Sequence, residues 1–365
     1  MMRAHKKVVI AMSGGVDSSV AAALLVEQGY EVIGIMLRLW SEPGNEENNR
    51  CCTPDAMAMA RRVAARLDIP FYALDAQDIF YKHVVSYFLD GYSHNITPNP
   101  CLACNRHVRW EYLFNHSLAL GADALATGHY VRLRESNTGN IELLRGLDRN
   151  KDQSYVLHIL NQDKLAHAIF PLGEYTKPQV RELARKYNLP VAERPESQDL
   201  CFLAREDYRE FLLRHAPGTI QSGPILNTEG KVIGQHTGLA YYTIGQRKGL
   251  RIASLSPLYV LKKDSEHNSL VVGPSNALGQ YELTANQVNW ISGQIPTHPI
   301  RAQVKIRYKS HDELAEITFF DRDRIHVKFD RSMRDITPGQ AVVIYDQDVC
   351  LGGGIIERLE SIVHG

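Results

Sequence analysis

A glycine- and serine-rich segment, residues 13–19 (SGGVDSS), stands between a short apolar run and a helical pattern. Glycines let the backbone turn tightly and approach a ligand closely. The amides at the start of the following helix point at whatever binds there, and the helix dipole favours an anion. The segment has neither the Gly-Lys-Ser/Thr ending of a Walker A loop nor a Gly-x-Gly-x-x-Gly pattern. We therefore predict a phosphate-binding loop at a strand–helix junction.

The first half of the chain alternates short apolar strands with helices. Strands are expected at residues 7–11, 31–39, 71–74 and 124–126, and helices at 18–28, 54–67, 79–92 and 177–186. Alternation at this spacing predicts a parallel sheet with helices on both faces. We therefore predict a doubly wound α/β domain over residues 1–208. Within it, residues 137–140 (NTGN) are typical of a turn and predict a hairpin between 131–134 and 141–145.

Beyond residue 208 the pattern changes, because glycines and prolines separate short apolar runs that are typical of strands. A second, softer change lies near residue 282, where a series of evenly spaced strands begins. We predict a small, mixed β-rich central domain that contacts RNA, residues 209–282. The last part, residues 283–365, is predicted to be a small β-barrel.

The composition, 44% hydrophobic and 22% charged over 365 residues, is that of a globular protein with two or three domains. The formal net charge is zero, which by itself indicates no nucleic-acid partner but can hide a basic patch. No apolar run reaches the roughly 20 residues that a membrane-spanning helix needs. Residues 8–11 are too short for the core of a signal peptide. We expect a cytoplasmic monomer without a membrane partner.

Three cysteines stand in segments that suggest chemistry. Cys101 and Cys104 follow two prolines in residues 97–105 (TPNPCLACN), and the prolines predict a fixed turn that brings both thiols towards one point. Cys201 follows in residues 197–202 (SQDLCF). Structural disulfides are not expected in a long chain without a secretory signal. These thiols are therefore candidate nucleophiles or metal ligands.

The string Ser-Gly-Gly-x-Asp-Ser resembles the PP-loop of N-type ATP pyrophosphatases. The chain as a whole resembles the bacterial tRNA-specific 2-thiouridylases, the MnmA family. The matching segments, which occur in order nearly from end to end, are residues 13–19, 97–105, 126–130 (ATGHY), 151–155 (KDQSY), 197–202, 245–249 (GQRKG), 305–308 (KIRY) and 338–340 (PGQ). The resemblance implies cleavage of ATP between its α- and β-phosphates and adenylation of a carbonyl oxygen.

The resemblance also implies roles for individual residues. ATP would be held by Ala11, Met12, Ser13, Gly14, Gly15, Val16, Asp17, Ser18, Leu37 and Gly128, with Asp17 helping to hold Mg²⁺. The flipped-out base would contact Asn99, Pro100 and Cys101. The tRNA would contact His129, Lys151, Asp152, Gln153, Arg307, Tyr308 and Gln340. Cys104 matches the cysteine nucleophile of the family, and Cys201 matches the cysteine that carries a persulfide.

The implied reaction replaces the 2-oxygen of the wobble uridine of a tRNA with sulfur. In one route Cys201 carries the sulfur as a persulfide, and Cys104 then releases the product and leaves a disulfide. Many relatives have Asp where Cys101 stands. The sequence therefore leaves a second route open, in which Cys101, Cys104 and Cys201 ligate a [4Fe–4S] cluster whose fourth iron holds a sulfide. A Zn²⁺ site with one further ligand is a third option.

Two other classes of function also remain open from the sequence. Another PP-loop enzyme, such as an amide-forming ligase or a lysidine-type tRNA modifier, would use an amine nucleophile and no cysteines. A non-catalytic RNA-binding or metal-storage protein would release no pyrophosphate. The partners implied by the resemblance are the anticodon region of Lys, Glu and Gln tRNAs and a sulfur donor, such as a cysteine desulfurase or a sulfur-relay protein.

Overall fold

A computed structural model of the chain describes residues 6–44, 53–195, 200–203, 207–334 and 336–358. Residues 197–199 of the matched segment around Cys201 therefore lie outside the described residues. The amino-terminal part holds a five-stranded sheet in the order β3-β2-β1-β4-β7, in which every pairing is parallel. Its strands are β1 (Lys7–Ala11), β2 (Glu31–Arg38), β3 (Phe71–Asp75), β4 (Ala124–Ala126) and β7 (Ala168–Ile169). The predicted parallel sheet is confirmed.

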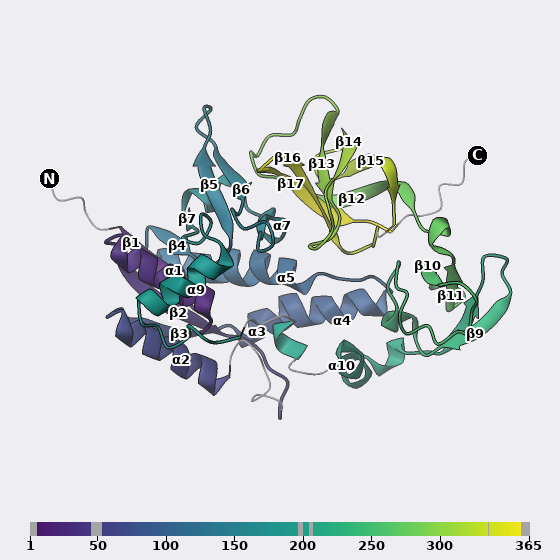
Figure 1. Cartoon of the computed structure of the whole chain (residues 1–365), viewed down its shortest axis with the longest axis horizontal. Helices are drawn as coiled ribbons and strands as arrows, with labels where there is room; N and C mark the ends of the chain where they lie inside the picture. The colour runs from purple at the N-terminus through teal and green to yellow at the C-terminus, as the bar shows by residue number, and fades with distance from the viewer. Residues whose placement is uncertain (1–5, 45–52, 196–199, 204–206, 335, 359–365) are drawn as a thin grey trace.

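Helices cover both faces of this sheet (Figure 1). Val8 and Ile10 of β1 pack against α1 (Val16–Glu27), α2 (Pro54–Arg66) and α9 (Lys177–Lys186). Val9, which points the other way because strand side chains alternate, packs against a helical stretch that includes Trp110 and Phe114. The predicted doubly wound arrangement is therefore confirmed. The described part of the chain contains no helix long and apolar enough to cross a membrane.

The structure differs from the sequence prediction after residue 99, where we expected a fixed turn. A helical stretch runs there through α5 (Pro100–Ala103), η3 (Cys104–Leu113) and α6 (Phe114–Ala119), and η3 has π-helical hydrogen bonds. Asn99 caps its start, since its side-chain oxygen accepts from the amide of Leu102 at 3.4 Å. Pro100 takes the first helical position, where its missing N–H costs nothing. The prolines therefore begin a helix instead of a turn.

The remaining helices are short. The predicted helix at 79–92 is confirmed as the run of α3 (Gln77–Phe80), η2 (Tyr81–Val85) and α4 (Ser86–Ser93). The others are α7 (Ser154–Leu157), α8 (Gln162–Ala166), η4 (Cys201–Leu203), α10 (Tyr208–His215), η5 (Pro217–Thr219), η6 (Leu239–Tyr241) and η7 (Ser275–Ala277).

The central part of the chain has its own small sheet, in the order β10-β11-β8-β9. Its strands are β8 (Gly223–Leu226), β9 (Val232–His236), β10 (Tyr259–Asp264) and β11 (Ser269–Gly273). Ile225, Val260 and Leu270 are buried in a core of their own beneath it.

The carboxyl-terminal part is a closed barrel, as predicted. Its strands run in the order β12-β15-β14-β13-β16-β17, and β12 also pairs with β17 to close it. They are β12 (Gln280–Trp290), β13 (Ile300–Lys305), β14 (Glu313–Phe319), β15 (Ile325–Met333), β16 (Ala341–Asp346) and β17 (Val349–Ile356).

The predicted hairpin is confirmed as β5 (Val131–Glu135) and β6 (Ile141–Arg145). The sequence did not predict which strand this hairpin would pair with. Strand β6 pairs with β17 of the barrel, so the hairpin extends the barrel sheet (Figure 1). Trp110, Leu143 and Tyr345 are consequently buried in one hydrophobic cluster that spans both parts. The barrel is thus fixed to the α/β part by a shared sheet and a shared core. The domain boundaries at residues 208 and 282 stay predictions.

Candidate active site

The loop between β1 and α1 passes close to two other segments. Gly14 has a φ of +70°, and a Cβ atom there would lie 2.4 Å from the carbonyl oxygen of Ala56. A Cβ atom on Gly128, just after β4, would lie 2.9 Å from the amide nitrogen of Ser18. Both positions therefore require glycine. The backbone of Gly128 covers one side of the amino end of α1.

Serine hydroxyls hold this loop in shape. Ser18 Oγ accepts from the amide of Ser13 at 3.1 Å and donates to the carbonyl oxygen of Gly15 at 3.3 Å. Ser19 Oγ donates to the same carbonyl at 2.7 Å. These hydrogen bonds within the protein therefore fix the loop and the first amides of α1 in a conformation that can bind an anion.

A charged pair lies at the same loop. Asp17 Oδ1 accepts from the ammonium group of Lys177 at 2.6 Å and from the hydroxyl of Tyr130 at 2.7 Å. Lys177 is 8% exposed. We did not single out Lys177 or Tyr130 from the sequence. One signal was available, because a lysine at the first position of a helix, as Lys177 is in α9, opposes the helix dipole and needs another reason to be there.

A cavity of about 220 Å³ opens beside the loop. Cys104 and Arg109 of η3 form one wall, and residues of the phosphate loop form another. The predicted nucleophile therefore faces the predicted nucleotide site. The residues expected to bind ATP that line this cavity are Ala11, Met12, Ser13, Asp17, Ser18, Leu37 and Gly128. Gly14, Gly15 and Val16 complete the loop without lining the cavity, and Val16 is buried in the core.

Cys104 and Cys201 are brought together by one hydrophobic cluster. Cys104 is 7% exposed and belongs to this cluster, and half-buried Cys201 packs against it. The cluster also contains Phe88 and Phe202, so it joins η4, which carries Cys201, to the helices beside the cavity. Among the described residues neither cysteine is in a disulfide. Cys104 lines the cavity beside the phosphate loop, and Cys201 lies against the same hydrophobic cluster as Cys104.

Cys101 and Cys104, which we expected to face one point, differ in exposure. Cys101 is exposed, whereas Cys104 is buried and lines the cavity beside the phosphate loop. The expectation that the two thiols face one point stays a prediction. Within the described ranges, no three His, Cys, Asp or Glu side chains lie close enough together to hold a metal ion. The donor set therefore does not fit a [4Fe–4S] cluster or a Zn²⁺ ion in this structure.

His129 and Gln153, two expected tRNA contacts, line the cavity beside the phosphate loop. His129 Nδ1 lies 2.7 Å from the hydroxyl of Thr127. Burial, together with the positive charge of Arg109, lowers the pKa of His129 to about 3, so its imidazole is neutral. Gln153 Oε1 accepts from the amide of Tyr130 at 3.0 Å.

Gln340 holds the segment that leads to the expected base contacts, which we call the strap, residues 95–101. Its Nε2 donates to the carbonyl oxygens of Thr97, at 2.8 Å, and Pro98, at 3.3 Å. The amide of Thr97 donates in turn to the carbonyl oxygen of Pro338 at 3.1 Å. The barrel therefore positions Asn99, Pro100 and Cys101 through Gln340 and its neighbours.

Arg307 and Tyr308, also expected tRNA contacts, are half-buried at the end of β13. Tyr308 packs edge-on against Tyr155, with ring centroids 6.1 Å apart. Burial and the negative charges of Asp152 and Cys101 raise the pKa of Tyr308 to about 12. The guanidinium group of Arg307 donates to the carbonyl oxygen of Ile244 at 3.1 Å and to the hydroxyl of Thr337. Arg307 therefore links the central part to the barrel.

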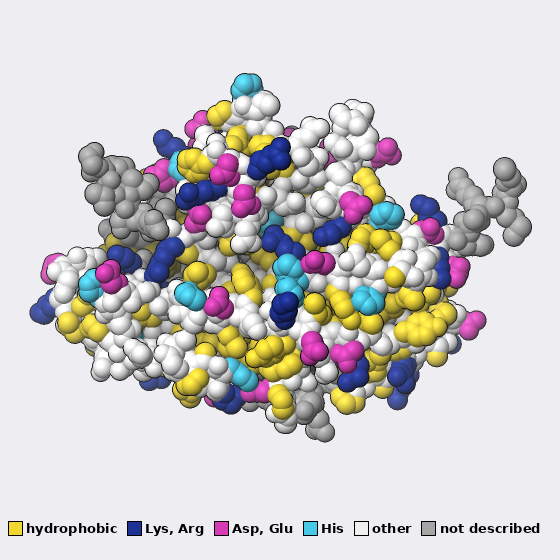
Figure 2. Space-filling model, turned by 180° about the vertical axis from the view of Figure 1, so that it is seen from behind, with side chains coloured by type: hydrophobic (Ala, Val, Ile, Leu, Met, Phe, Trp, Pro, Cys, Tyr) yellow, Lys and Arg dark blue, Asp and Glu magenta, His cyan; other side chains and the backbone are white. Residues whose placement is uncertain are grey.

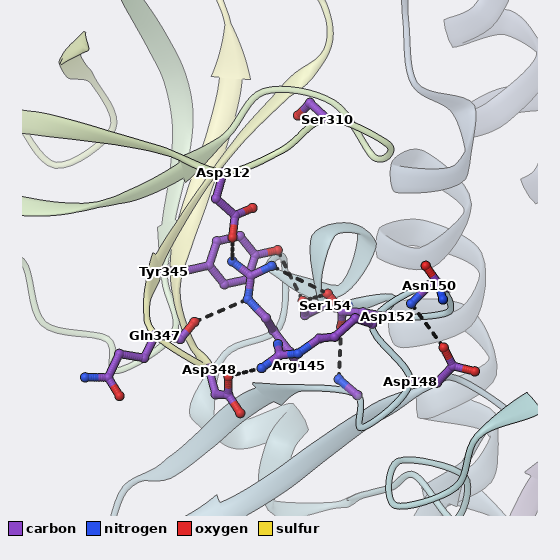
Figure 3. Close-up of polar contacts among 12 residues, drawn as sticks. Arg145, Asp148, Asn150, Asp152, Ser154, Ser310, Asp312, Tyr345, Gln347 and Asp348 are labelled. Atoms are coloured by element: carbon purple, nitrogen blue, oxygen red, sulfur yellow. Dashed lines mark hydrogen bonds and ion pairs between the residues drawn. The ribbon is translucent and has the colours of Figure 1, made fainter. Parts of the chain in front are cut away.

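Asp152 uses its side chain inside the protein. It is 5% exposed, and its Oδ1 accepts from the amides of Gly146 at 3.0 Å and Ser154 at 3.1 Å. Its Oδ2 accepts from the hydroxyl of Ser154 at 2.9 Å (Figure 3). The carboxylate therefore holds the turn between Lys151 and Gln153 in place, and in this conformation only the backbone of Asp152 could meet RNA.

Arg145 completes this network across the junction with the barrel. Its guanidinium carbon lies 3.5 Å from the ring centroid of Tyr345, and it donates to Asp312 at 2.5 Å (Figure 3). It also lies 3.9 Å from the carboxylate of Asp152. The side chain of Arg145 is only 7% exposed. A buried cation thus stands between two carboxylates that come from different parts of the chain.

Three family models match the chain in succession. They are described as a tRNA methyl transferase HUP domain (residues 6–205), a tRNA methyl transferase PRC-barrel domain (209–274) and an aminomethyltransferase beta-barrel domain (280–356). A tRNA-specific 2-thiouridylase MnmA from Carboxydothermus hydrogenoformans is 48% identical over 97% of this chain and 98% of its own length. The chain belongs to the tRNA-specific 2-thiouridylase (MnmA) family.

A further member of the 2-thiouridylase family, from Moorella thermoacetica, is 47% identical over 97% of this chain and all of its own length. Among solved structures, a 4-thiouridine synthetase–RNA complex with bound ATP covers 58% of this chain and 50% of its own, with 17% identity and a TM-score of 0.36.

A larger cleft, of about 1400 Å³, lies between the helices η2, α4 and η3 and the barrel. In this 2-thiouridylase family member the phosphate loop and Cys104 line the smaller cavity instead. The charged residues of the large cleft are Lys82, Arg106, Arg324, Arg358, Asp90 and Glu357, so cations outnumber acids. Figure 2 shows Lys, Arg and His side chains gathered near the middle of the rear face. The zero net charge therefore does conceal local basic surface.

Replacing Arg145 with methionine is expected to lower the free energy of unfolding by about 3–5 kcal/mol, because it leaves buried carboxylates without their cation. Urea denaturation of both proteins measures the difference. The matched control is Arg134→Met on the same hairpin, where the side chain is 59% exposed and pairs with Glu142. Arg134→Met should lower the free energy of unfolding by less than about 1 kcal/mol. Equal losses in the two variants would show that the buried network contributes little.

Proposed function

We propose that this protein is an ATP-dependent tRNA sulfurtransferase that replaces the 2-oxygen of the wobble uridine with sulfur. The observation that carries the proposal is that the phosphate loop and Cys104 line one cavity. An adenylating sulfurtransferase must bring the α-phosphate of ATP and a sulfur nucleophile to the same carbonyl group, and this arrangement suits that task. Relatives that match nearly the whole chain are named for the same activity.

The phosphate loop would activate the uridine. The phosphates of ATP would bind at the amino end of α1, with Lys177 as a cation and Asp17 as the carboxylate for Mg²⁺. The 2-oxygen of uridine attacks the α-phosphorus, the bond to the β-phosphate breaks, and pyrophosphate leaves. Carbon 2 of the base then carries AMP, which is a much better leaving group than an oxide.

Cys201 and Cys104 would complete the transfer. A donor protein first leaves a persulfide on Cys201. Its terminal sulfur attacks carbon 2, AMP departs, and the base is joined to Cys201 through a disulfide. The thiolate of Cys104 then attacks Cys201 Sγ, and the electron pair of the broken S–S bond goes to the sulfur of 2-thiouridine. A disulfide between Cys104 and Cys201 remains, and an external thiol must reduce it before the next turnover.

The structure supports the persulfide route over the cluster route. Cys104 and Cys201 pack in one hydrophobic cluster, whereas Cys101 is exposed to solvent, and no metal-binding trio is gathered in the described residues. The rival PP-loop enzymes that use an amine nucleophile have no use for Cys104 at the cavity. The full-length match to 2-thiouridylases counts against them as well.

The strap and Tyr308 would receive the base. Single-stranded anticodon bases can be turned out at little cost, which suits a site built on a helix start and an aromatic ring. We extend to this chain the expectation that Lys, Glu and Gln tRNAs are modified. A cysteine desulfurase or a sulfur-relay protein is the expected donor. We also keep the prediction of a cytoplasmic monomer.

Nucleoside mass spectrometry tests the proposal. The purified protein is incubated with unmodified tRNA, ATP, Mg²⁺, a cysteine desulfurase with cysteine, and a thiol reductant. We expect 2-thiouridine to appear at the wobble position in equal amount to AMP and pyrophosphate, and none to form without ATP. The same yield is expected from protein shown to be free of iron. Product that forms only in iron-containing protein would contradict the persulfide route, and no product with any tRNA would contradict the function.

A further inference from the structure

A second cavity, of about 340 Å³, lies where the α/β part, the central part and the barrel meet. Residues 95–97 of the strap, 261–263 of β10 and 336–338 before β16 line it. Ile244, Gln280, Glu357 and Arg358 complete the lining. None of the steps described above uses this cavity.

Lys263 places a buried ammonium group at this cavity. The residue is 7% exposed, and among the described residues its Nζ has no hydrogen-bond partner. A buried ammonium group without a partner costs several kcal/mol, and such groups are normally paired. An anion bound in the cavity would supply the missing partner.

The charged side chains that the structure describes around Lys263 do not neutralise it. Arg358 also lines the cavity and donates to the hydroxyl of Ser265. Burial and the positive charge of Arg358 lower the pKa of Lys263 to about 7. Glu357 is the one acid among the described residues that line the cavity, and it already accepts hydrogen bonds from other groups. Its Oε2 accepts from Arg324 at 2.8 Å and its Oε1 from Asn286 at 3.2 Å.

We propose that this cavity is a phosphate-binding subsite in which Lys263 and Arg358 hold the anion. Amide and hydroxyl side chains of Asn95, Gln280 and Thr337 also line it, and a phosphate group has enough oxygens to accept from several donors at once. The assignment of a phosphate follows from this donor set and does not depend on which molecule carries it.

The position of the subsite favours a backbone phosphate of the substrate RNA as the occupant. The strap leads from the cavity to Asn99 and Cys101, and residues 336–338 lead to Gln340. Arg307 binds the carbonyl oxygen of Ile244 and the hydroxyl of Thr337, both at this cavity. This choice of RNA rests on the proposed function. Free inorganic phosphate is the other source of the same chemistry.

Thermal unfolding with inorganic phosphate tests the subsite without RNA. A non-hydrolysable ATP analogue is kept at saturation, so that the phosphate loop is occupied. The melting temperature of the wild type should rise with phosphate concentration, because a ligand that binds the folded state stabilises it. Lys263→Met should lose this rise and should melt higher than the wild type without phosphate, because its unpaired ammonium is gone.

Lys231→Met, in the exposed turn between β8 and β9, is the matched control and should keep the phosphate response. An equal response in the wild type and in Lys263→Met would overturn the subsite, and so would no response in the wild type.

Binding of an anticodon stem-loop RNA over a range of salt concentrations separates the two sources. If RNA supplies the phosphate, Lys263→Met should weaken binding at least about tenfold and reduce the salt slope by roughly one unit. Loss of the phosphate response with unchanged RNA affinity would assign the subsite to free phosphate and overturn the RNA assignment. Formation of 2-thiouridine by the wild type is assayed separately, so its absence would count against the proposed function alone.

Discussion

Serine in place of Cys104 or Cys201 is expected to reduce 2-thiouridine formation at least about a thousandfold, as is usual when a catalytic nucleophile is removed. The reaction should stop at a different intermediate in each variant. Without Cys201 no persulfide forms, so adenylated tRNA is the last species. Without Cys104 the base should stay joined to Cys201 through a disulfide, which dithiothreitol releases. Pyrophosphate release in a single turnover should persist in both, because the phosphate loop is intact. Intact-mass analysis of the protein and nucleoside analysis of the tRNA measure these outcomes.

Two other cysteines supply the controls for this experiment. Cys350 is fully buried in the core shared with the barrel, and Cys350→Ala should leave sulfur transfer within about threefold, at a modest cost in stability. Cys101 is exposed, and Cys101→Asp should retain activity because the persulfide route does not use its sulfur. Loss of activity in Cys101→Asp, together with loss of bound iron, would restore the cluster route. Full activity in Cys104→Ser would remove Cys104 from the mechanism.

Asp17→Asn is expected to slow pyrophosphate release at least about a hundredfold while the fold persists. The amide can still accept from Tyr130, but the loop loses the carboxylate that we assign to Mg²⁺, and Lys177 loses its counter-charge. Pyrophosphate is measured in a single turnover with tRNA and ATP, over a range of Mg²⁺ concentrations. Far-ultraviolet circular dichroism checks the fold.

Asp55→Asn is the matched control for this prediction. Asp55 starts α2 close to the same loop, and its side chain is 73% exposed and pairs with Arg194. The same chemical change should alter pyrophosphate release less than twofold there, since an exposed ion pair contributes little. Equal losses in both variants would indicate a general charge effect at the loop and would remove the specific role of Asp17.

Local sequence patterns were sufficient to predict the phosphate loop and the parallel sheet that precedes it. The glycines and serines of residues 13–19 adopt the predicted strand–helix junction, and strands β1 to β4 lie where apolar runs indicated them. Each of these features depends on neighbours in the chain, namely turn residues, helix starts and hydrophobic periodicity. The hairpin turn after β5 was predicted for the same reason.

The helix after Pro100 was missed because one motif allows two local structures. Proline restricts its own φ and fits both a turn and the first position of a helix. The side-chain bond from Asn99 to Leu102 and the packing of Trp110 in a shared core decide for the helix. In the resulting helix, Cys104 lines the cavity beside the phosphate loop and Cys101 is exposed.

The sequence by itself determined the phosphate loop, the succession of sheet and barrel and, through the family resemblance, the residues to examine. Only the tertiary structure decided which of them meet. It paired Lys177 with Asp17, joined β6 to β17, buried Asp152 and left the ammonium group of Lys263 without a hydrogen-bond partner among the described residues. The physical reason is the distance along the chain between the residues that interact. A turn or a helix start is specified by adjacent residues, whereas a cavity, a buried ion pair or a shared sheet depends on how segments more than a hundred residues apart pack together.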